Sequence, residues 1–441
     1  MPQPTAQNDQ TRASRSPHPI GRRLVAGLLA VHTAAWVLSA PAAADGRSDL
    51  LRQLAGEYLG ATAVVLFATA TLLSTRARWL EPWFGGLDKM YRAHRETATL
   101  GFALLAAHAA TTPWRLTSPG GVPSGLLAFA GITVMVALAL GPRLPVLRRV
   151  ITIGYGRWRI LHRFVGIFLI MALAHMLLVD AVVHAMPVPF AITMAAFVTG
   201  IGAFLYSLLL ARLVRPRRAY TVTAVRRLND ATVEIGLALR RGRPLEFHSG
   251  QFVFASFRRR GLREPHPFTV SSAAHDPHLR LTVKAAGDFT RRLPDRLGPG
   301  VKAVVEGAYG MMDYRRGGPD QVWVAGGIGV TPFLSWCRDL TEDPGHRIDF
   351  FYTVRDRADA LFWDEIVAVA RRHPRLRPHL HVSSEAGSLT VPRIVARARV
   401  DPASTEVYLC GPVPMIRALE RGFRDAGAPA ARIHFEEFGF R

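Results

Sequence analysis

Four histidines occupy two apolar stretches of the sequence at nearly matched spacing. His94 and His108 are 14 residues apart in the first stretch, and His162 and His175 are 13 residues apart in the second. A histidine at bilayer depth is costly to bury, so it usually has a ligand or a polar partner. Each pair spans about 20 Å of helix at roughly 1.5 Å per residue. Two such helices side by side would present one histidine pair near each membrane face, which is the ligand set for two stacked haem groups.

Helical geometry favours one of these pairs over the other. A step of 14 residues returns a side chain to within about 40° of its starting face, whereas a step of 13 residues leaves it about 140° away. His94 and His108 therefore share a helix face. His162 and His175 need helix tilt, a distortion near Gly166, or haem groups held from different sides. A hydrogen-bonded core histidine is the alternative for any one of the four, but two matched pairs favour haem.

The basic charge of the chain is explained by membrane topology. The 441 residues carry a net charge of +22 and are 49% hydrophobic, with a mean hydropathy of +0.15. In a soluble protein this charge would suggest a nucleic-acid partner. Here the arginines gather at the ends of apolar segments on one side, as they do in cytoplasmic loops. We therefore expect contact with membrane lipid and no nucleic-acid partner.

The cysteine content excludes two kinds of chemistry. Cys337 and Cys410 are the two cysteines of the sequence, and both lie in the part assigned to the cytoplasm, which argues against a disulfide framework. An iron–sulfur cluster needs four thiolates and is excluded within this chain. Electron transfer here needs other carriers.

The first half of the sequence predicts a membrane domain. Residues 1–19 are polar and are predicted to be a disordered tail. Residues 20–215 are predicted to form a transmembrane, haem-binding domain of six helices. Their apolar segments lie at residues 24–40, 56–73, 97–112, 125–141, 160–180 and 190–213. Residues 20–44 also have the pattern of a signal peptide, so they are either a retained first helix, which we favour, or a cleaved signal.

An inside amino terminus accounts for the arginines. If the amino terminus is cytoplasmic and six helices cross the membrane in turn, twelve arginines lie near the helix ends on the cytoplasmic side and three lie outside. Both termini are then cytoplasmic, in an integral protein of the plasma (inner) membrane. Because the third and fifth helices run in the same direction, His94 faces His162 near the cytoplasm and His108 faces His175 near the exterior.

The second half of the sequence predicts two further domains. Residues 216–314 contain five or six short alternating runs, with a turn at Asn229-Asp230, and predict a small antiparallel β-barrel. Residues 315–441 alternate strand-like and helix-like patterns, which is typical of a parallel, doubly wound α/β sheet.

A glycine-rich segment follows the first of these predicted parallel strands. It reads VAGGIGVTPF at residues 324–333. Its glycines would let the backbone approach a phosphate closely, and Thr331 with Pro332 makes a good start for the next helix, whose amino terminus attracts an anion. Such a turn alone could be structural. Between a strand and a helix it predicts a dinucleotide pyrophosphate site.

Two more strand ends lie at the same predicted edge. Cys410, Gly411 and Pro412 end a later strand, and ligands of open α/β sheets bind along this edge. Cys410 could instead be a small core thiol. Arg355 follows the strand IDFFYTV and could hold a ribose 2′-phosphate with its guanidinium group, or it could be a solvated surface charge.

The combined motifs resemble the transmembrane NADPH oxidase and ferric reductase superfamily. HPFT at residues 266–269 is similar to its flavin-binding motif, and VKAAGDFT at 283–290 is similar to its flavin pyrophosphate motif. GGIGVTPF and CGP match its nicotinamide dinucleotide half, and the family's paired histidines have spacings of 14 and 13. The resemblance covers roughly residues 56–441. It implies a six-helix transmembrane bundle, an antiparallel β-barrel FAD domain and an α/β doubly wound NAD(P)H-binding domain of the ferredoxin reductase type.

The resemblance also implies roles for individual residues. The flavin ring would be lined by His266, Pro267, Phe268 and Thr269, with the Thr269 hydroxyl near the reactive nitrogen. The FAD pyrophosphate would be contacted by Lys284 and Thr290. The NADPH site would include Gly326, Gly327, Gly329, Thr331, Pro332, Arg355, Cys410, Gly411 and Pro412. Thr269 and Cys410 are the catalytic candidates, with Cys410 near the nicotinamide. Phe438, or alternatively Phe440, would stack on the flavin, although either could be ordinary core.

These features predict an electron path across the membrane. NAD(P)H would reduce FAD, and electrons would pass to an inner haem b on His94 and His162, then to an outer haem b on His108 and His175. The acceptor would be dioxygen, giving superoxide, or a ferric chelate, and His32, Arg115 or His184 could assist reduction of dioxygen. An electron carrier for an extracytoplasmic protein partner and a haem-free tethered flavoreductase are the other hypotheses. The sequence has no EF-hand loop, so calcium control within this chain is not supported.

Overall fold

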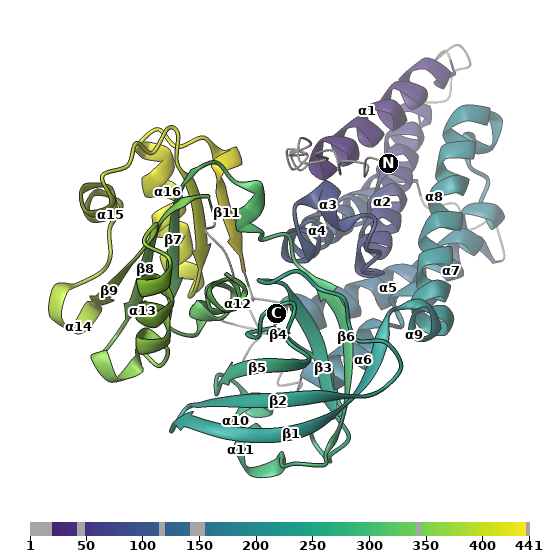
Figure 1. Ribbon diagram of the computed structural model, residues 1–441. Helices are drawn as coiled ribbons and strands as arrows, with labels where there is room; N and C mark the ends of the chain where they lie inside the picture. The colour runs from purple at the N-terminus through teal and green to yellow at the C-terminus, as the bar shows by residue number, and fades with distance from the viewer. Residues whose placement is uncertain (1–19, 42–48, 114–119, 142–154, 341–344, 438–441) are drawn as a thin grey trace, which may run out of the picture. The chain divides into compact units, whose positions relative to one another are not determined.

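The computed structural model describes residues 20–41, 49–113, 120–141, 155–340 and 345–437 (Figure 1). The predicted disordered tail, residues 1–19, lies outside these ranges. The described residues up to Val214 form one compact unit, called here the helical unit, and those from Arg215 onward form a second, called the C-terminal unit.

The helical unit has helices at all six places where the sequence has apolar segments. The first four segments lie in α1 (Gly21–Ser39), α2 (Leu50–Ser74), α4 (Leu87–Thr111) and α5 (Gly121–Leu140), and a short α3 (Glu81–Phe84) precedes α4. The fifth segment overlaps the end of α6 (Tyr155–His162) and includes α7 (Val165–Leu178). The sixth overlaps α8 (Pro187–Leu205), a π-helical turn (Tyr206–Leu210) and α9 (Ala211–Val214). Pro187 opens α8, where the missing N–H of proline leaves no helical hydrogen bond unmade.

The fifth predicted helix is interrupted. Helix α6 ends at His162, and Arg163 and Phe164 make turn hydrogen bonds to Ile160 and Leu161 before α7 begins. The break lies between His162 and His175. The straight-helix calculation that separates these side chains by about 140° therefore does not apply to this segment.

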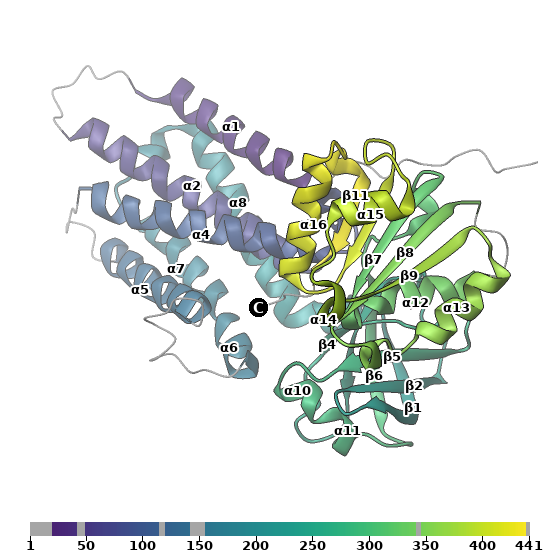
Figure 2. The ribbon, with the colours of Figure 1, turned by 90° about the vertical axis from the view of Figure 1, so that its left-hand side faces the viewer.

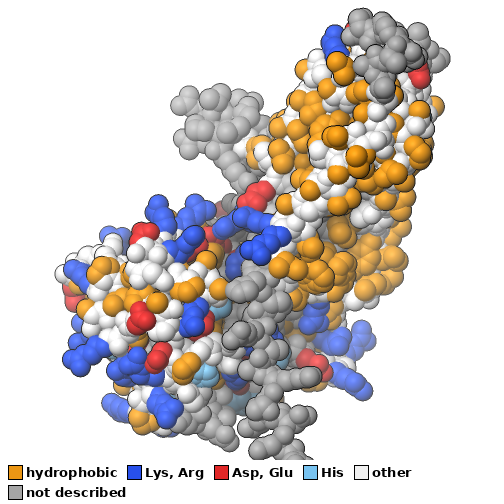
Figure 3. Space-filling model, turned by 90° about the horizontal axis from the view of Figure 1, so that it is seen from above, with side chains coloured by type: hydrophobic (Ala, Val, Ile, Leu, Met, Phe, Trp, Pro, Cys, Tyr) orange, Lys and Arg blue, Asp and Glu red, His pale blue; other side chains and the backbone are white. Residues whose placement is uncertain are grey.

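Four helical stretches are long and apolar enough to cross a membrane, judged by length and composition. They are Leu50–Ser74, Gly121–Leu140, Arg157–Leu178 and Pro187–Val214. Helix α4 carries charged residues throughout its first half, from Asp88 to Glu96, and is not among them. Apolar side chains are spread over the face of the helical unit that is seen in Figure 3. Leu38 and Leu213 are more than 80% exposed. A transmembrane bundle of six helices therefore stays a prediction.

The first half of the C-terminal unit is a barrel-like antiparallel sheet. Its strands are β1 (Arg217–Asn229), β2 (Thr232–Arg241), β3 (Phe252–Phe257), β4 (His266–Thr269), β5 (His278–Lys284) and β6 (Lys302–Tyr309). They pair in the order β4-β3-β6-β1-β2-β5, and a bridge between Val270 and Leu281 joins the two ends. Strands β1 and β2 form a hairpin in which Asn229 accepts a hydrogen bond from the Ala231 amide, as the predicted turn requires. The small antiparallel barrel is thus confirmed.

The second half is a parallel sheet with helices on both faces. Its strands are β7 (Asp320–Gly326), β8 (Arg347–Val354), β9 (Leu376–Val382), β10 (Glu406–Cys410) and β11 (Ile433–Glu436). One face packs against α12 (Thr331–Asp339) and α13 (Trp363–Arg372), and the other against α15 (Val391–Ala398) and α16 (Val413–Asp425) (Figure 2). The strand order β11-β10-β7-β8-β9 reverses direction between β7 and β10. That is the switch point at which open α/β sheets bind ligands.

Helix α12 joins the two halves of the C-terminal unit. Ser335 donates to the carbonyl of Ser272, and the Trp336 indole donates to the carbonyl of Ser249, both at 2.7 Å. Arg338 lies almost fully buried between the halves, where it pairs with Glu365 at 2.6 Å and donates to the carbonyl of Ser271. Burial opposes the charge of Arg338, but the hydrogen bond to Glu365 and the charges of Glu365 and Glu234 outweigh it and raise its pKa.

We expect Arg338→Met to destabilise the C-terminal unit by about 2–4 kcal/mol, because it leaves buried acceptors without their cation. The matched control is Arg347→Met, which breaks a half-exposed pair with Asp320 and should cost less than about 1 kcal/mol. Chemical unfolding of the full chain, followed by flavin fluorescence, measures both. Equal losses in the two variants would contradict the role assigned to Arg338.

Candidate functional site

The glycine-rich segment forms the turn between β7 and α12. Strand β7 ends at Gly326, residues Gly327–Val330 make one 3₁₀ turn, and α12 begins at Thr331. Gly327 has a φ of +53°, and no atom lies within 4 Å of where its Cβ would stand. An open, left-handed glycine lets a ligand approach the backbone closely.

Two other glycines of this segment are required by the packing of β7 against β10. A Cβ on Gly329 would lie 2.3 Å from the carbonyl oxygen of Cys410. A Cβ on Gly326 would lie 2.7 Å from the Met415 sulfur, and one on Gly411 would lie 3.0 Å from the Gly326 Cα. The ends of the two strands therefore meet backbone against backbone. The motif serves this close packing as well as access for a ligand.

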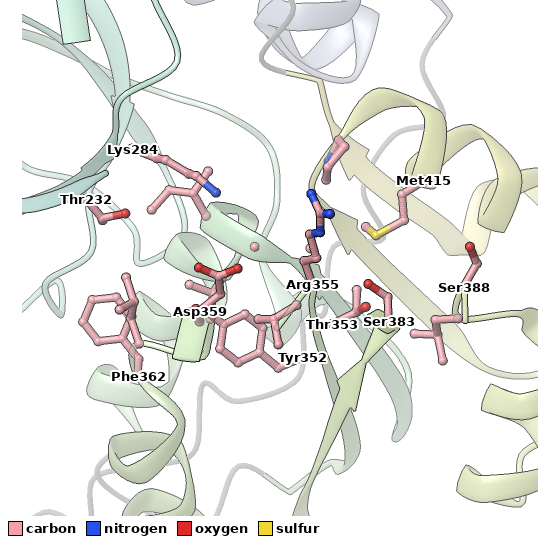
Figure 4. Close-up of a pocket in the computed structure, with 18 of the residues that line it drawn as sticks. Thr232, Lys284, Tyr352, Thr353, Arg355, Asp359, Phe362, Ser383, Ser388 and Met415 are labelled. Carbon is pink, nitrogen blue, oxygen red and sulfur yellow. The ribbon is translucent and has the colours of Figure 1, made fainter. Parts of the chain in front are cut away.

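A cavity of about 540 Å³ opens beside this turn (Figure 4). It falls within the range of roughly 300–1,000 Å³ that is usual for ligand and cofactor sites. The sequence-predicted residues on its wall are Gly326, Gly327, Lys284, Arg355 and Pro412. Lys284 comes from the barrel and the others come from the parallel sheet, so the cavity is shared by both halves of the C-terminal unit.

Three other residues predicted for the nucleotide site are buried beside the turn. Cys410 is 1% exposed, and Thr331 and Pro332 are buried at the start of α12. The Thr331 hydroxyl donates to the Ile328 carbonyl at 3.1 Å and closes the 3₁₀ turn. None of the three appears among the cavity-lining residues. The Cys410 thiol is thus placed as the core interpretation describes, while its neighbour Pro412 lines the cavity.

The cavity wall includes residues that the sequence analysis missed. They include Thr232, Tyr352, Thr353, Asp359, Phe362, Ser383, Ser388 and Met415. Burial raises the pKa of Tyr352, with a further contribution from the charge of Asp359, so its hydroxyl stays neutral. Tyr352 and Thr353 lie near the end of β8, which Arg355 follows directly, and Ser383 directly follows β9. These three could have been found by examining the carboxyl end of every parallel strand, because ligands of open α/β sheets bind there.

Arg355 extends into solvent at the cavity. Its side chain is 86% exposed, and Asp356 lies 3.9 Å from its guanidinium group. Ser383 lies on the same wall, and its neighbour Ser384 donates its backbone N–H to the Arg355 carbonyl at 3.0 Å. An exposed guanidinium group and a hydroxyl on the same cavity wall are suitable partners for a phosphate dianion.

The two flavin motifs lie against each other. On β4, Phe268 and Thr269 are buried, whereas His266 and Pro267 are partly exposed. The His266 ring stacks on Phe289 at 3.8 Å between ring centres, and Phe289 belongs to the VKAAGDFT motif. Phe289 is a candidate that the sequence analysis missed, although it lies within the quoted motif.

Thr290 holds the loop before it. Its hydroxyl oxygen accepts from the amides of Ala286 and Gly287 at 2.9 and 3.0 Å. No atom lies within 4 Å of where a Cβ on Gly287 would stand, so the loop is open on that side. Lys284 is exposed, the loop at Ala286 and Gly287 is held by the Thr290 hydroxyl, and the space beside Gly287 is open. These features suit the binding of a pyrophosphate group. Phe438 and Phe440 lie outside the described residues.

The helical unit brings the four predicted histidines together in two pairs. The ring centres of His94 and His162 are 6.4 Å apart, and those of His108 and His175 are 6.2 Å apart. Two imidazoles bound through Nε2 to one metal ion, with bonds of about 2.0 Å, have ring centres about 6.3 Å apart. Both separations therefore suit a metal ion between the rings. Among the described residues, no cluster of three or more potential metal ligands occurs.

Three of these rings are bound to backbone carbonyl groups through Nδ1. His94 binds Ala70, His108 binds Gly56 and His175 binds Gly121, at 2.7–2.8 Å. A carbonyl only accepts, so the Nδ1 carries the proton and Nε2 keeps its lone pair for a metal. His162 instead stacks on Trp158, and its Nδ1 has no hydrogen-bond partner among the described residues. The donor set fits two bis-histidine haem groups.

Two of the three residues considered for dioxygen chemistry are described, and both make other contacts. His32 is fully buried and stacks on Tyr58 at 5.8 Å between ring centres. His184 contacts the Met176 carbonyl at 3.0 Å through Nε2. Arg115 lies outside the described residues.

Comparison with known proteins identifies two domains of the C-terminal unit. A model of the FAD-binding domain matches residues 218–319, and a model of the oxidoreductase NAD-binding domain matches residues 323–421. The reductase component of an alkene monooxygenase system from Xanthobacter autotrophicus is 31% identical over 51% of this chain and 71% of its own length. The reductase component of propane 2-monooxygenase from Rhodococcus jostii is 27% identical over 49% of this chain. The chain covers 62% of that relative, less than two thirds of its length.

A solved structure resembles the chain over a longer stretch. It is a flavohemoglobin from Malassezia yamatoensis with bound FAD and haem, with a TM-score of 0.53 and 16% identity. The match covers 93% of this chain and 98% of that one. At 16% identity, this similarity is evidence for a shared fold and not for a shared function.

We expect Gly329→Ala to lower kcat/KM for NAD(P)H oxidation by at least about tenfold, because the new methyl group would displace the strand end at Cys410. FAD content should stay unchanged. Gly298→Ala is the control, since no atom lies within 4 Å of its Cβ position. Ferricyanide reduction by the full chain measures the effect, and wild-type kinetics in Gly329→Ala would contradict it.

Proposed function

This chain belongs to the ferredoxin-reductase-type flavoprotein family, and we propose that it passes electrons from cytoplasmic NAD(P)H through FAD and two b-type haem groups to an acceptor beyond the membrane. One observation carries this proposal beyond the family. The helical unit holds two imidazole pairs at 6.2 and 6.4 Å, close to the separation of about 6.3 Å expected across one metal ion.

The cavity of the C-terminal unit is the entry point for electrons. Gly326 and Gly327 would admit the NAD(P)H pyrophosphate, and Arg355 with Ser383 would hold the ribose end. Thr269 and Lys284 would orient the flavin from the barrel side. FAD, when bound, accepts a hydride and releases its two electrons singly. The residues therefore bind and align two nucleotides, and Thr269 is the candidate that contacts the reacting part of the flavin.

The helical unit would provide the path across the bilayer. Its four apolar stretches and highly exposed leucines suit contact with lipid. His94 and His162 would hold the inner haem, and His108 and His175 would hold the outer one. Haem groups, when bound, carry single electrons. The arginine-rich helix ends support an integral protein of the plasma (inner) membrane, with both termini and the C-terminal unit in the cytoplasm.

Dioxygen is the proposed acceptor, which makes the chain a superoxide-producing NADPH oxidase. A small neutral molecule can reach the edge of an outer haem without a dedicated binding site. A ferric chelate is the alternative small acceptor. A protein partner outside the cytoplasm is the other alternative. Both relatives described above are reductase components, which is consistent with a protein acceptor but gives no location for it.

The first test is an anaerobic absorption spectrum of the detergent-purified chain before and after NADPH, followed by air. Haem bands that appear on reduction and disappear rapidly in air, with superoxide formed, are the expected result. Haem that stays reduced in air would favour a ferric chelate or a protein acceptor. The absence of haem bands would contradict the proposal.

We expect His108→Leu to remove about half of the haem and to abolish reduction of the external acceptor, because only the inner pair remains intact. NADPH-to-flavin transfer should be unchanged, since the C-terminal unit is untouched. The control is His184→Leu, which should keep both haem groups. Unchanged external reduction in His108→Leu would contradict the proposed path.

We expect Arg355→Ala to lower kcat/KM for NADPH by about 10–100-fold while leaving that for NADH nearly constant, because only NADPH has a 2′-phosphate. Arg357→Ala is the matched control, because Arg357 is similarly exposed and pairs with Glu385 at 3.7 Å. Steady-state rates with both nucleotides measure the preference. Equal losses with NADPH and NADH would show that Arg355 does not read the phosphate.

A further inference from the structure

Helix α2 presents a carbonyl group and a glycine to His108. The His108 Nδ1 lies 2.8 Å from the carbonyl oxygen of Gly56. Four residues further along α2, a Cβ on Gly60 would lie 2.8 Å from the same nitrogen. Such a contact is too short for a methyl group, so the His108 ring occupies the space that a side chain at position 60 would fill.

Helix α5 presents the same arrangement to His175. The His175 Nδ1 lies 2.7 Å from the carbonyl oxygen of Gly121. A Cβ on Gly125, again four residues further along, would lie 2.5 Å from this nitrogen. The two histidines of one pair are therefore held by different helices through equivalent contacts.

Helix geometry explains why the carbonyl and the glycine are four residues apart. Every Cα–Cβ bond of an α-helix tilts toward the amino terminus, so the side chain at i+4 lies over residue i. An outside donor that approaches the carbonyl of residue i meets this side chain. Glycine at i+4 leaves the approach open. Because glycine destabilises a helix interior by about 1 kcal/mol relative to alanine, its presence at these positions needs a compensating contact.

The inner pair lacks this arrangement. His94 binds the carbonyl of Ala70, one turn before α2 ends at Ser74. His162 lies at the end of α6, and its Nδ1 has no partner among the described residues. The glycine contacts thus distinguish the outer pair from the inner one.

We propose that Gly60 and Gly125 are positioning residues for the outer haem. Each admits an imidazole to a helix carbonyl, which keeps the proton on Nδ1 and turns Nε2 toward the partner ring. This inference rests on the proposed function, and it adds residues that touch neither the nucleotides nor the metal. The outer haem depends on both glycines, whereas the inner haem depends on neither.

The test compares alanine variants of four glycines in the full, detergent-purified chain. Gly60→Ala and Gly125→Ala place a methyl group against a histidine. Gly200→Ala crowds the helix packing without touching a histidine, because its Cβ would lie 2.7 Å from a Leu169 methyl and 3.1 Å from the Ala68 Cα. No atom lies within 4 Å of the Cβ position of Gly202, so Gly202→Ala measures only the effect of replacing glycine by alanine within a helix.

The readouts are the ratio of haem to FAD, an optical redox titration and the low-temperature electron paramagnetic resonance spectrum of oxidised haem. We expect Gly60→Ala and Gly125→Ala each to lose about half of the haem. Where the outer haem is retained, one of the two titrating components should shift to a higher potential and one low-spin signal should change, because the carbonyl no longer strengthens the ligand. Gly200→Ala and Gly202→Ala should keep both components at their wild-type positions.

Several outcomes would overturn the inference while leaving the proposed function intact. They are wild-type haem content and potentials in both histidine-facing variants, an equal effect of Gly200→Ala, or loss of both haem groups from Gly60→Ala and Gly125→Ala, since the last two indicate general packing. A wild-type chain without haem would instead refute the proposed function, and this inference with it.

Discussion

The helical unit is governed by the need to give polar groups a partner among apolar helices. An imidazole between such helices is destabilising unless its nitrogens are engaged. Backbone carbonyl groups are the acceptors that every helix offers, and His94, His108 and His175 each use one through Nδ1. This hydrogen bond fixes the tautomer and leaves the Nε2 lone pair available to a metal ion. The spacing of the helices and the chemistry of the histidine pairs therefore follow from the same hydrogen bonds.

Close backbone approach has a second use in the C-terminal unit. Gly329 lets the turn after β7 pack on the carbonyl of Cys410, and Gly327 leaves the adjacent backbone open to the cavity. In both units, a missing Cβ admits a group to the backbone. In the helices that group is an imidazole, and at the sheet edge it is another strand end and, in the proposed function, a pyrophosphate. The arrangement of α12 completes the cavity, because Trp336 and Arg338 hold the parallel sheet against the barrel.

Much of this fold could be predicted because its signals are local. Strand alternation predicted the barrel, strand–helix alternation predicted the parallel sheet, and the direction of the helices predicted which histidines face each other. The missed features depend on contacts between distant residues. Phe289 stacks on His266 because two chain segments meet, and Gly60 matters because α4 brings His108 to it. The break between His162 and Val165 lies next to Gly166, where a helix distortion was one of the three alternatives drawn from the 13-residue spacing. The roles of individual site residues stay predictions.

The unequal surroundings of the two histidine pairs bear on the direction of electron flow in the proposed function. A hydrogen bond from Nδ1 to a carbonyl makes an imidazole a stronger donor to its metal, which favours the oxidised state. The outer pair has two such bonds, and the inner pair has one among the described residues. In the proposed function, this effect alone would make the outer haem harder to reduce than the inner one. Outward transfer then depends on an acceptor that removes electrons rapidly, and an outer haem of low potential is suited to one-electron reduction of dioxygen. The same carbonyl contacts that fix the geometry of the outer pair thus favour the acceptor proposed for it.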